Sequence, residues 1–143
     1  MRTGRTLVRR LAVAAGLALL AAHSPPAAAQ QAPSGVAKPV PGLEKLKGRW
    51  VRAEGGYVLE IRAVGPGGKL EAAYFNPRSI HVATAEASRK GAAVEVFVEL
   101  RDVNYPGSTY TLSYDEKNDR LVGRYFQAVA RETFDVHFVR QKP

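Results

Sequence analysis

Polar side chains recur near the ends of several apolar, alternating segments of this 143-residue chain. They combine phenol hydroxyls with side-chain amides, and they are Tyr74, Asn76, Asn104, Tyr105, Tyr110, Tyr125 and Gln127. A buried hydroxyl or amide is costly without a hydrogen-bond partner, so a purely structural core favours Leu, Val and Phe. Convergent polar groups at the edge of an apolar interior are also what orients a small ligand. These residues are therefore the candidate ligand-binding residues.

A structural explanation of the same residues stays open. Tyrosine hydroxyls near strand ends can reach water or one another. The sequences Asn76-Pro77 and Tyr105-Pro106-Gly107 are also typical of turns. The residue types alone do not separate these two explanations.

Catalytic and metal chemistry have little support in the sequence. It contains no nucleophile elbow, no phosphate-binding glycine loop and no His pair at metal-ligand spacing. His81 and His137 fall on different predicted strands with outward parity, and no two carboxylates are placed to converge as in a glycosidase. The chain has no Cys. We therefore expect no enzymatic activity, no cofactor and no metal.

The segments that must position the candidate residues are predicted to be short β-strands. In residues 92–100, for example, apolar side chains alternate with polar ones at period two. Turns rich in Gly, Pro and Asn separate the predicted strands, which are 48–53, 57–64, 69–75, 80–88, 92–100, 109–114, 121–129 and 133–140.

This series of strands predicts an all-β, antiparallel, up-and-down sheet. Closing about eight strands into a barrel removes both exposed edges and leaves an interior for side chains or one small ligand. A two-sheet sandwich is the alternative. Its Greek-key topology needs a long connection, for which residues 101–108 are the only candidate.

A second set of residues concerns the closure of the barrel. Gly48 and Trp50 open the first strand, and Arg140 ends the last one. Period-two parity puts Arg140 on the face of three residues predicted to be interior, namely Phe134, Val136 and Phe138. A guanidinium there can stack on the Trp50 indole and hydrogen-bond carbonyls of residues 43–47. Gly48, Trp50 and Arg140 are thus predicted to form a structural clasp; the alternative is an exposed Arg140 at a fraying terminus.

The Gly48-x-Trp50 motif, followed by a β-meander that ends at Arg140, resembles the calycin group of lipocalins, fatty-acid-binding proteins and avidin-like barrels. The resemblance covers the architecture of about residues 43–142. The chain departs from a full-size lipocalin in its short length, its tight hairpins and its lack of a C-terminal helix and a disulfide. It is more similar to the compact lipocalin-like domains of bacterial exported proteins. The resemblance implies a lipocalin-like barrel that binds small apolar molecules.

The N-terminal region predicts export. Four arginines precede an unbroken apolar run over residues 11–22, and Ala27-Ala28-Ala29 offers a signal-peptidase site. Residues 1–29 are therefore predicted to be a signal peptide cleaved near Ala29, residues 30–42 a flexible Pro- and Gly-rich linker, and residues 43–143 the barrel domain. The apolar run is short for a bilayer span, and without Cys there is no site for an acylated anchor. We expect a periplasmic or secreted protein with no stable membrane anchor.

The net charge argues against nucleic acid as a partner. Four of the 21 Lys and Arg lie in the predicted signal peptide and all 13 acidic residues follow it, so the mature chain carries +4 rather than +8. Its basic residues are scattered singly between apolar ones, which is typical of a solvated outer face.

Two functional hypotheses remain. In the first, the barrel binds a small apolar or amphipathic ligand in its mouth through the polar residues above. In the second, the interior is filled and the outer surface, around Phe97 and Phe126, contacts a protein partner as an interaction or inhibitor module.

Overall fold

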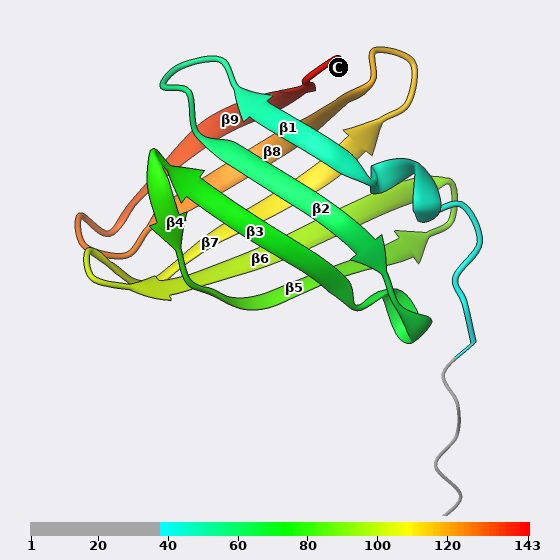
Figure 1. Ribbon diagram of the computed structural model, residues 1–143, viewed down its shortest axis with the longest axis horizontal. Helices are drawn as coiled ribbons and strands as arrows, with labels where there is room; N and C mark the ends of the chain where they lie inside the picture. The colour runs from blue at the N-terminus through cyan, green and yellow to red at the C-terminus, as the bar shows by residue number, and fades with distance from the viewer. Residues whose placement is uncertain (1–37) are drawn as a thin grey trace, which may run out of the picture. The chain divides into compact units, whose positions relative to one another are not determined.

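The computed structural model describes residues 38–143, which form one antiparallel sheet of nine strands (Figure 1). The strands are β1 (Gly48–Arg52), β2 (Val58–Val64), β3 (Leu70–Asn76), β4 (Arg78–Ile80), β5 (Val82–Lys90), β6 (Ala93–Asp102), β7 (Tyr105–Asp115), β8 (Arg120–Gln127) and β9 (Glu132–Arg140). Two 3-10 turns accompany them, η1 (Glu44–Leu46) and η2 (Pro66–Gly68). The predicted signal peptide and most of the predicted linker lie outside the described residues.

The sheet curls into a nearly closed barrel. Its strand order is β4-β3-β2-β1-β9-β8-β7-β6-β5, so the first and last long strands pair and Trp50 lies opposite Arg140. The remaining edges meet at one isolated bridge, between Lys69 and Glu86. The predicted all-β, up-and-down barrel is confirmed, with nine strands in place of about eight.

The additional strand arises because the predicted strand 80–88 divides at His81. Residues up to Ile80 pair with β3 as β4, whereas residues from Val82 onward pair with β6 as β5. The backbone of His81 is held at the crossing. Its N–H donates to Asp102 Oδ2 at 2.8 Å, and its carbonyl accepts from the Arg101 N–H at 3.0 Å. One continuous segment therefore serves both edges of the sheet.

The predicted long connection at 101–108 is wrong. β6 continues to Asp102 and β7 starts at Tyr105, so Val103 and Asn104 make a two-residue turn. Asn104 has a φ of 69°, the left-handed conformation that Asn tolerates in tight hairpins. Pro106 is accommodated where the β6–β7 register shifts, near the strand end. Residues 38–143 thus lack the long crossover that a sandwich needs.

The core follows the predicted alternation of side chains. Alternate residues of a strand are buried, as for Leu59 and Ile61 on β2 and Val96 and Val98 on β6. The largest side chains buried with them are Trp50, Tyr74, Tyr110 and Phe138. Phe134 is an exception to the predicted interior, because it is 39% exposed. It lies near the start of β9, beyond Phe138, where the pairing of β9 with β1 ends.

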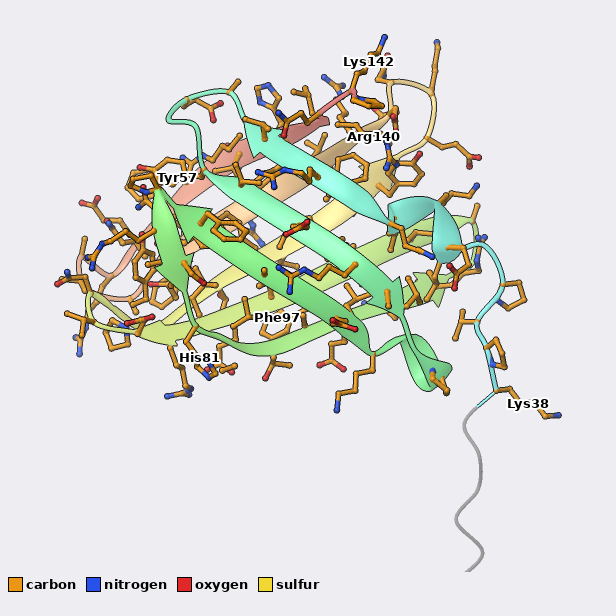
Figure 2. All side chains as sticks on the ribbon, in the orientation of Figure 1. Lys38, Tyr57, His81, Phe97, Arg140 and Lys142 are labelled. Atoms are coloured by element: carbon orange, nitrogen blue, oxygen red, sulfur yellow. The ribbon has the colours of Figure 1, made fainter. Side chains whose placement is uncertain are left out.

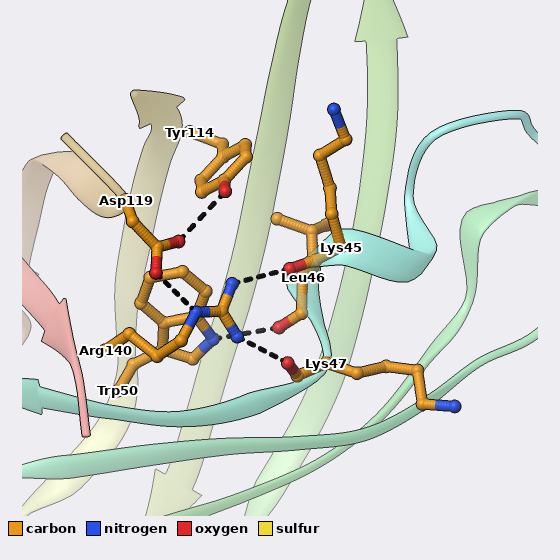
Figure 3. Close-up of polar contacts among 7 residues, drawn as sticks. All are labelled: Lys45, Leu46, Lys47, Trp50, Tyr114, Asp119 and Arg140. Atoms are coloured by element: carbon orange, nitrogen blue, oxygen red, sulfur yellow. Dashed lines mark hydrogen bonds and ion pairs between the residues drawn. The ribbon is translucent and has the colours of Figure 1, made fainter. Parts of the chain in front are cut away.

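The opposite end of the barrel is closed by the clasp (Figure 3). The guanidinium of Arg140 lies over the Trp50 ring, 4.1 Å from its centroid, and donates at 2.6 Å to the carbonyls of Lys45 and Lys47. The indole Nε1 donates to the carbonyl of Leu46 at 2.9 Å. These bonds satisfy the carbonyls of η1 and connect the first strand to the last.

Two further residues complete the clasp. Asp119, in the β7–β8 turn, accepts from Arg140 Nε at 2.7 Å and from the Tyr114 hydroxyl at 2.9 Å. The bond from Arg140 holds the pKa of Asp119 below its ordinary value. A Cβ at Gly48, whose φ is +139°, would approach Arg140 Nη1 to 2.6 Å. The structure thus brings Gly48, Trp50 and Arg140 together at one end of the barrel.

Contacts with the barrel begin before Leu43. The Gly67 N–H donates to the Lys38 carbonyl at 3.2 Å, and Val40 packs against the core.

Between Lys38 and Pro143 there is no helix of the length and apolarity that crossing a bilayer requires.

Candidate functional site

A cavity of about 290 Å³ lies at the end of the barrel away from the clasp. Twelve residues line it: Arg52, Tyr57, Tyr74, Asn76, Arg78, Ile80, Val103, Asn104, Tyr105, Tyr110, Tyr125 and Gln127. The seven candidate residues from the sequence, Tyr74 to Gln127, are all among them. We call this end of the barrel the mouth and its hollow the mouth cavity.

Antiparallel pairing explains why residues so distant in sequence meet there. β1 ends at Arg52, β2 starts after Tyr57, and β3 ends at Asn76. These three positions therefore lie at the same end of the barrel. The β6–β7 turn and the end of β8 lie at the same end, on the other side of the barrel (Figure 1). Figure 2 shows Tyr57 at this end and Arg140 toward the opposite one.

Aromatic rings form the floor of the mouth cavity. The hydroxyls of Tyr74 and Tyr110 are 2.7 Å apart and hydrogen-bonded, and both side chains are buried. Tyr110 stacks on Tyr125 with ring centroids 4.5 Å apart, and its edge meets Phe138 at 5.3 Å. Farther from the mouth than Tyr110, Val96 and Leu112 are buried in the barrel. The cavity is therefore a cup above a packed core.

The hydroxyls of the floor need no ligand to be satisfied. Tyr74 and Tyr110 satisfy each other, as the structural explanation of the sequence requires. Throughout residues 38–143, every buried side-chain nitrogen and oxygen has a hydrogen-bond partner. The groups available to a ligand are thus those at the rim, which face the cavity and solvent.

The rim is held by contacts between hairpins. The Asn76 amide donates to the Tyr105 hydroxyl, and the Tyr105 ring packs edge-on against Tyr74 with centroids 6.4 Å apart. Ser108, which is fully buried, accepts from the Ala128 N–H at 3.1 Å and fixes the β8–β9 turn to β7. The turns around the cavity are therefore tied to the barrel wall.

Arg52 is the most buried charge in the mouth cavity. Its side chain is 13% exposed, with Nε donating to Glu54 at 3.1 Å. Its guanidinium also lies 5.0 Å from the Tyr57 ring centroid and 5.6 Å from that of Tyr125. These contacts hold the guanidinium in one place between two aromatic rings.

Burial keeps the floor tyrosines neutral. It raises the pKa of Tyr110 to about 12, and it also raises the pKa of Tyr74 and of Tyr125. These phenols are therefore hydrogen-bond donors and acceptors rather than anions near neutral pH. The formal charge of the cavity lining comes from Arg52 and Arg78.

The sequence prediction missed five of the lining residues, namely Arg52, Tyr57, Arg78, Ile80 and Val103. Tyr57 begins the predicted strand 57–64 but was not included among the candidates. Arg52 could have been found by parity, because it lies two residues after Trp50 and shares its inward face. Arg78 and Val103 adjoin turns, where strand parity gives no direction.

A second hollow, of about 570 Å³, lies between β3 and β5. It occurs where these strands separate between the short β4 strand and the Lys69–Glu86 bridge. Small side chains such as Ala72, Ala83 and Ala85 line much of it. It is larger than the mouth cavity, but it has no aromatic side chain and no arginine.

Residues with catalytic or metal-binding potential do not gather in the part of the chain that is described. Within residues 38–143, no three His, Asp or Glu side chains are grouped to hold a metal ion. His81 is exposed, and His137 lies outside the mouth with Nδ1 3.4 Å from Glu54.

The chain has no match among protein-family models, curated proteins or solved structures.

Proposed function

We propose that this protein is an exported barrel that binds a small, partly apolar molecule in the mouth cavity. The main support is the convergence of five tyrosines, three side-chain amides and two arginines on one hollow at the open end. Rigid aromatic surface with a few oriented polar groups is the usual composition of a small-molecule site.

The dimensions of the cavity favour a compact ligand. Its volume of about 290 Å³ is at the lower end of the range for ligand pockets. The rings of Tyr74 and Tyr110 block the way deeper into the barrel, and the core beneath them is packed. A long acyl chain would therefore have no room below the cup.

The sequence supports the remaining parts of the proposal. The basic and apolar N-terminal pattern resembles a signal peptide, which supports export of the mature protein to the periplasm or outside the cell. The clasp and the up-and-down barrel are the features shared with calycins, for which binding in the barrel interior is the common activity. N-terminal sequencing of the exported protein tests the cleavage site near Ala29.

Native mass spectrometry tests ligand binding directly. The protein is purified from the periplasm of the cells that produce it, and a non-covalent adduct is sought that gas-phase activation releases. Two variants of neighbouring residues on β8 make a matched pair. Gln127→Trp fills the mouth cavity and should remove the adduct, whereas Phe126→Trp changes the outer face and should retain it. An adduct equally abundant in both variants would place the ligand elsewhere.

The outer-surface hypothesis has weaker support. Phe126 is 38% exposed, but Phe97 is half-buried. Thr109 and Thr111 of β7 lie between the two phenylalanines in the sheet register. The two rings therefore do not form one continuous apolar patch.

A further inference from the structure

The mouth cavity has an uneven balance of charge. Among the described residues that line it, Arg52 and Arg78 are cationic and none is an Asp or Glu. Asn104 and Gln127 add amide donors at the rim, whereas the hydroxyls of Tyr74 and Tyr110 are already bonded to each other. A ligand in this cup therefore meets two positive charges and several donors, without a facing carboxylate.

Two carboxylates that contact residues of the mouth cavity are not part of its lining. Glu54 contacts Arg52 through Nε, but Glu54 is itself about half exposed, so water screens its charge more than that of the deeper guanidinium. Asp102 accepts from the backbone N–H of His81 at 2.8 Å and of Val103 at 2.7 Å. Each oxygen of Asp102 thus accepts one backbone N–H, and these bonds lower its pKa.

Arg78 has no such partner. Within residues 38–143, no carboxylate oxygen lies within 4.0 Å of its guanidinium. It stands at the start of β4, beside Asn76, with which it pairs in the β3–β4 ladder. Its charge contributes to lowering the pKa of Asp102 without a direct ion pair, so the guanidinium keeps its hydrogen-bond donors for an anion at the rim.

We propose that the ligand of the mouth cavity is a small planar aromatic molecule that carries a negatively charged group. Arg52 and Arg78 receive the charged group, and the aromatic part lies among the tyrosine side chains. A guanidinium recognises planar anions through paired hydrogen bonds, and aromatic rings recognise a flat apolar body. This inference rests on the proposed function and adds the chemical class of its ligand.

A pair of probes that differ only in charge tests the inference. 2-Naphthoate is an anion at neutral pH, and 2-naphthamide has the same ring system with a neutral group. Titration calorimetry gives both affinities, and the side-chain amide NMR signals of Asn104 and Gln127 report whether the probe occupies the mouth. We expect the carboxylate to bind at least about tenfold more tightly, and its advantage to shrink in high salt, which screens charge.

Arginine variants identify the source of the preference. Arg78→Gln should reduce the advantage of naphthoate severalfold, and Arg52→Gln, once circular dichroism shows that it is folded, should reduce it further. Arg124→Gln is the matched control, because Arg124 is exposed on the outer face of β8. Its affinities should equal those of the wild type.

The outcomes separate this inference from the proposed function. If acid and amide bind the mouth equally, the charge preference is wrong, but the mouth remains a small-molecule site. An unchanged preference in both Arg78→Gln and Arg52→Gln also overturns the inference. If neither probe perturbs the mouth and no adduct is found by native mass spectrometry, the proposed function itself fails.

Discussion

Replacing Arg140 by Ala should destabilise the barrel more than removing an ordinary surface arginine does. Arg140 lies at one end of the β1–β9 ladder, and its guanidinium combines a stack on Trp50 with bonds to Lys45, Lys47 and Asp119. In the variant the Trp50 ring and the two carbonyls lose the guanidinium, and Asp119 keeps only its bond from the Tyr114 hydroxyl.

The magnitude follows from these contacts. A cation over a desolvated Trp face contributes up to about 2 kcal/mol. Hydrogen bonds from a charged donor contribute about 1.5–3 kcal/mol each. The terms do not add fully, because at the barrel end water can replace the guanidinium at the carbonyls and Asp119 is only half-buried. We therefore expect a loss of about 2–4 kcal/mol.

Urea denaturation is the assay, with Trp50 fluorescence and circular dichroism as two probes of the same transition. Arg120→Ala is the matched control. Its Nε pairs with Asp115 at 2.9 Å, but the side chain is 43% exposed and lies over no ring, so the loss should stay below about 1 kcal/mol. Arg140→Lys should be intermediate, because it keeps the charge and loses the fork of donors.

The reasoning would be refuted if Arg140→Ala lost no more stability than Arg120→Ala. That result would mean that the β1–β9 ladder closes the barrel without the clasp. A stability equal to the wild type in Arg140→Lys would show that charge alone, rather than the fork geometry, accounts for the effect.

Three further predictions concern protonation and the floor tyrosines. Arg140 lowers the folded-state pKa of Asp119, so the stabilisation by Asp119 is present above the ordinary Asp pKa and is lost as pH falls toward the lowered pKa. The wild type should therefore lose more stability on acidification than Arg140→Ala. Parallel profiles of stability against pH for the two proteins would contradict this. Tyr110→Phe leaves the buried Tyr74 hydroxyl without its partner and should lower the free energy of unfolding by about 1–3 kcal/mol. Adding Tyr74→Phe should restore much of this loss in a double-mutant cycle measured by thermal unfolding. Additive losses would exclude coupling between the two hydroxyls. Because the pKa values of Tyr110 and Tyr74 are raised in the folded protein, the unfolded chain releases these phenol protons at lower pH, and stability should fall as pH rises above the ordinary Tyr pKa. Ultraviolet titration should show these two phenols ionising above the ordinary range or upon unfolding. Complete ionisation of all 6 tyrosines near pH 10 in the folded protein would contradict this prediction.

The sequence predicted the fold class because side-chain alternation is a local property. Val94, Val96 and Val98 point inward whichever strands lie beside them, since the period of a strand is two. The same parity put Arg140 on the inward face of the last strand. Parity does not give neighbours, so the pairing of these two strands was an inference from barrel closure.

The wrong predictions share a physical cause. Residues 80–88 have one continuous alternating pattern, but His81 lies where the chain changes partner from β3 to β6. Pro106 and Gly107 are typical of loops, but a register shift near the mouth accommodates them inside β7. Phe134 has inward parity, but it lies beyond the part of β9 that pairs with β1 and is exposed. In each case the long-range pairing overrides the local pattern.

The candidate site shows the same division. The residue types near strand ends pointed to a polar mouth, and seven such residues share the cavity. Arg52 was missed because its charge favoured an outer face, although its parity pointed inward.

By itself the sequence determined which side chains face inward and that the strands form an antiparallel meander, because both follow from local alternation and turn chemistry. Only the tertiary structure decided that Tyr74 and Tyr110 satisfy each other and that Arg52 and Arg78 meet at one hollow, because strand register and barrel curvature determine which distant residues become neighbours.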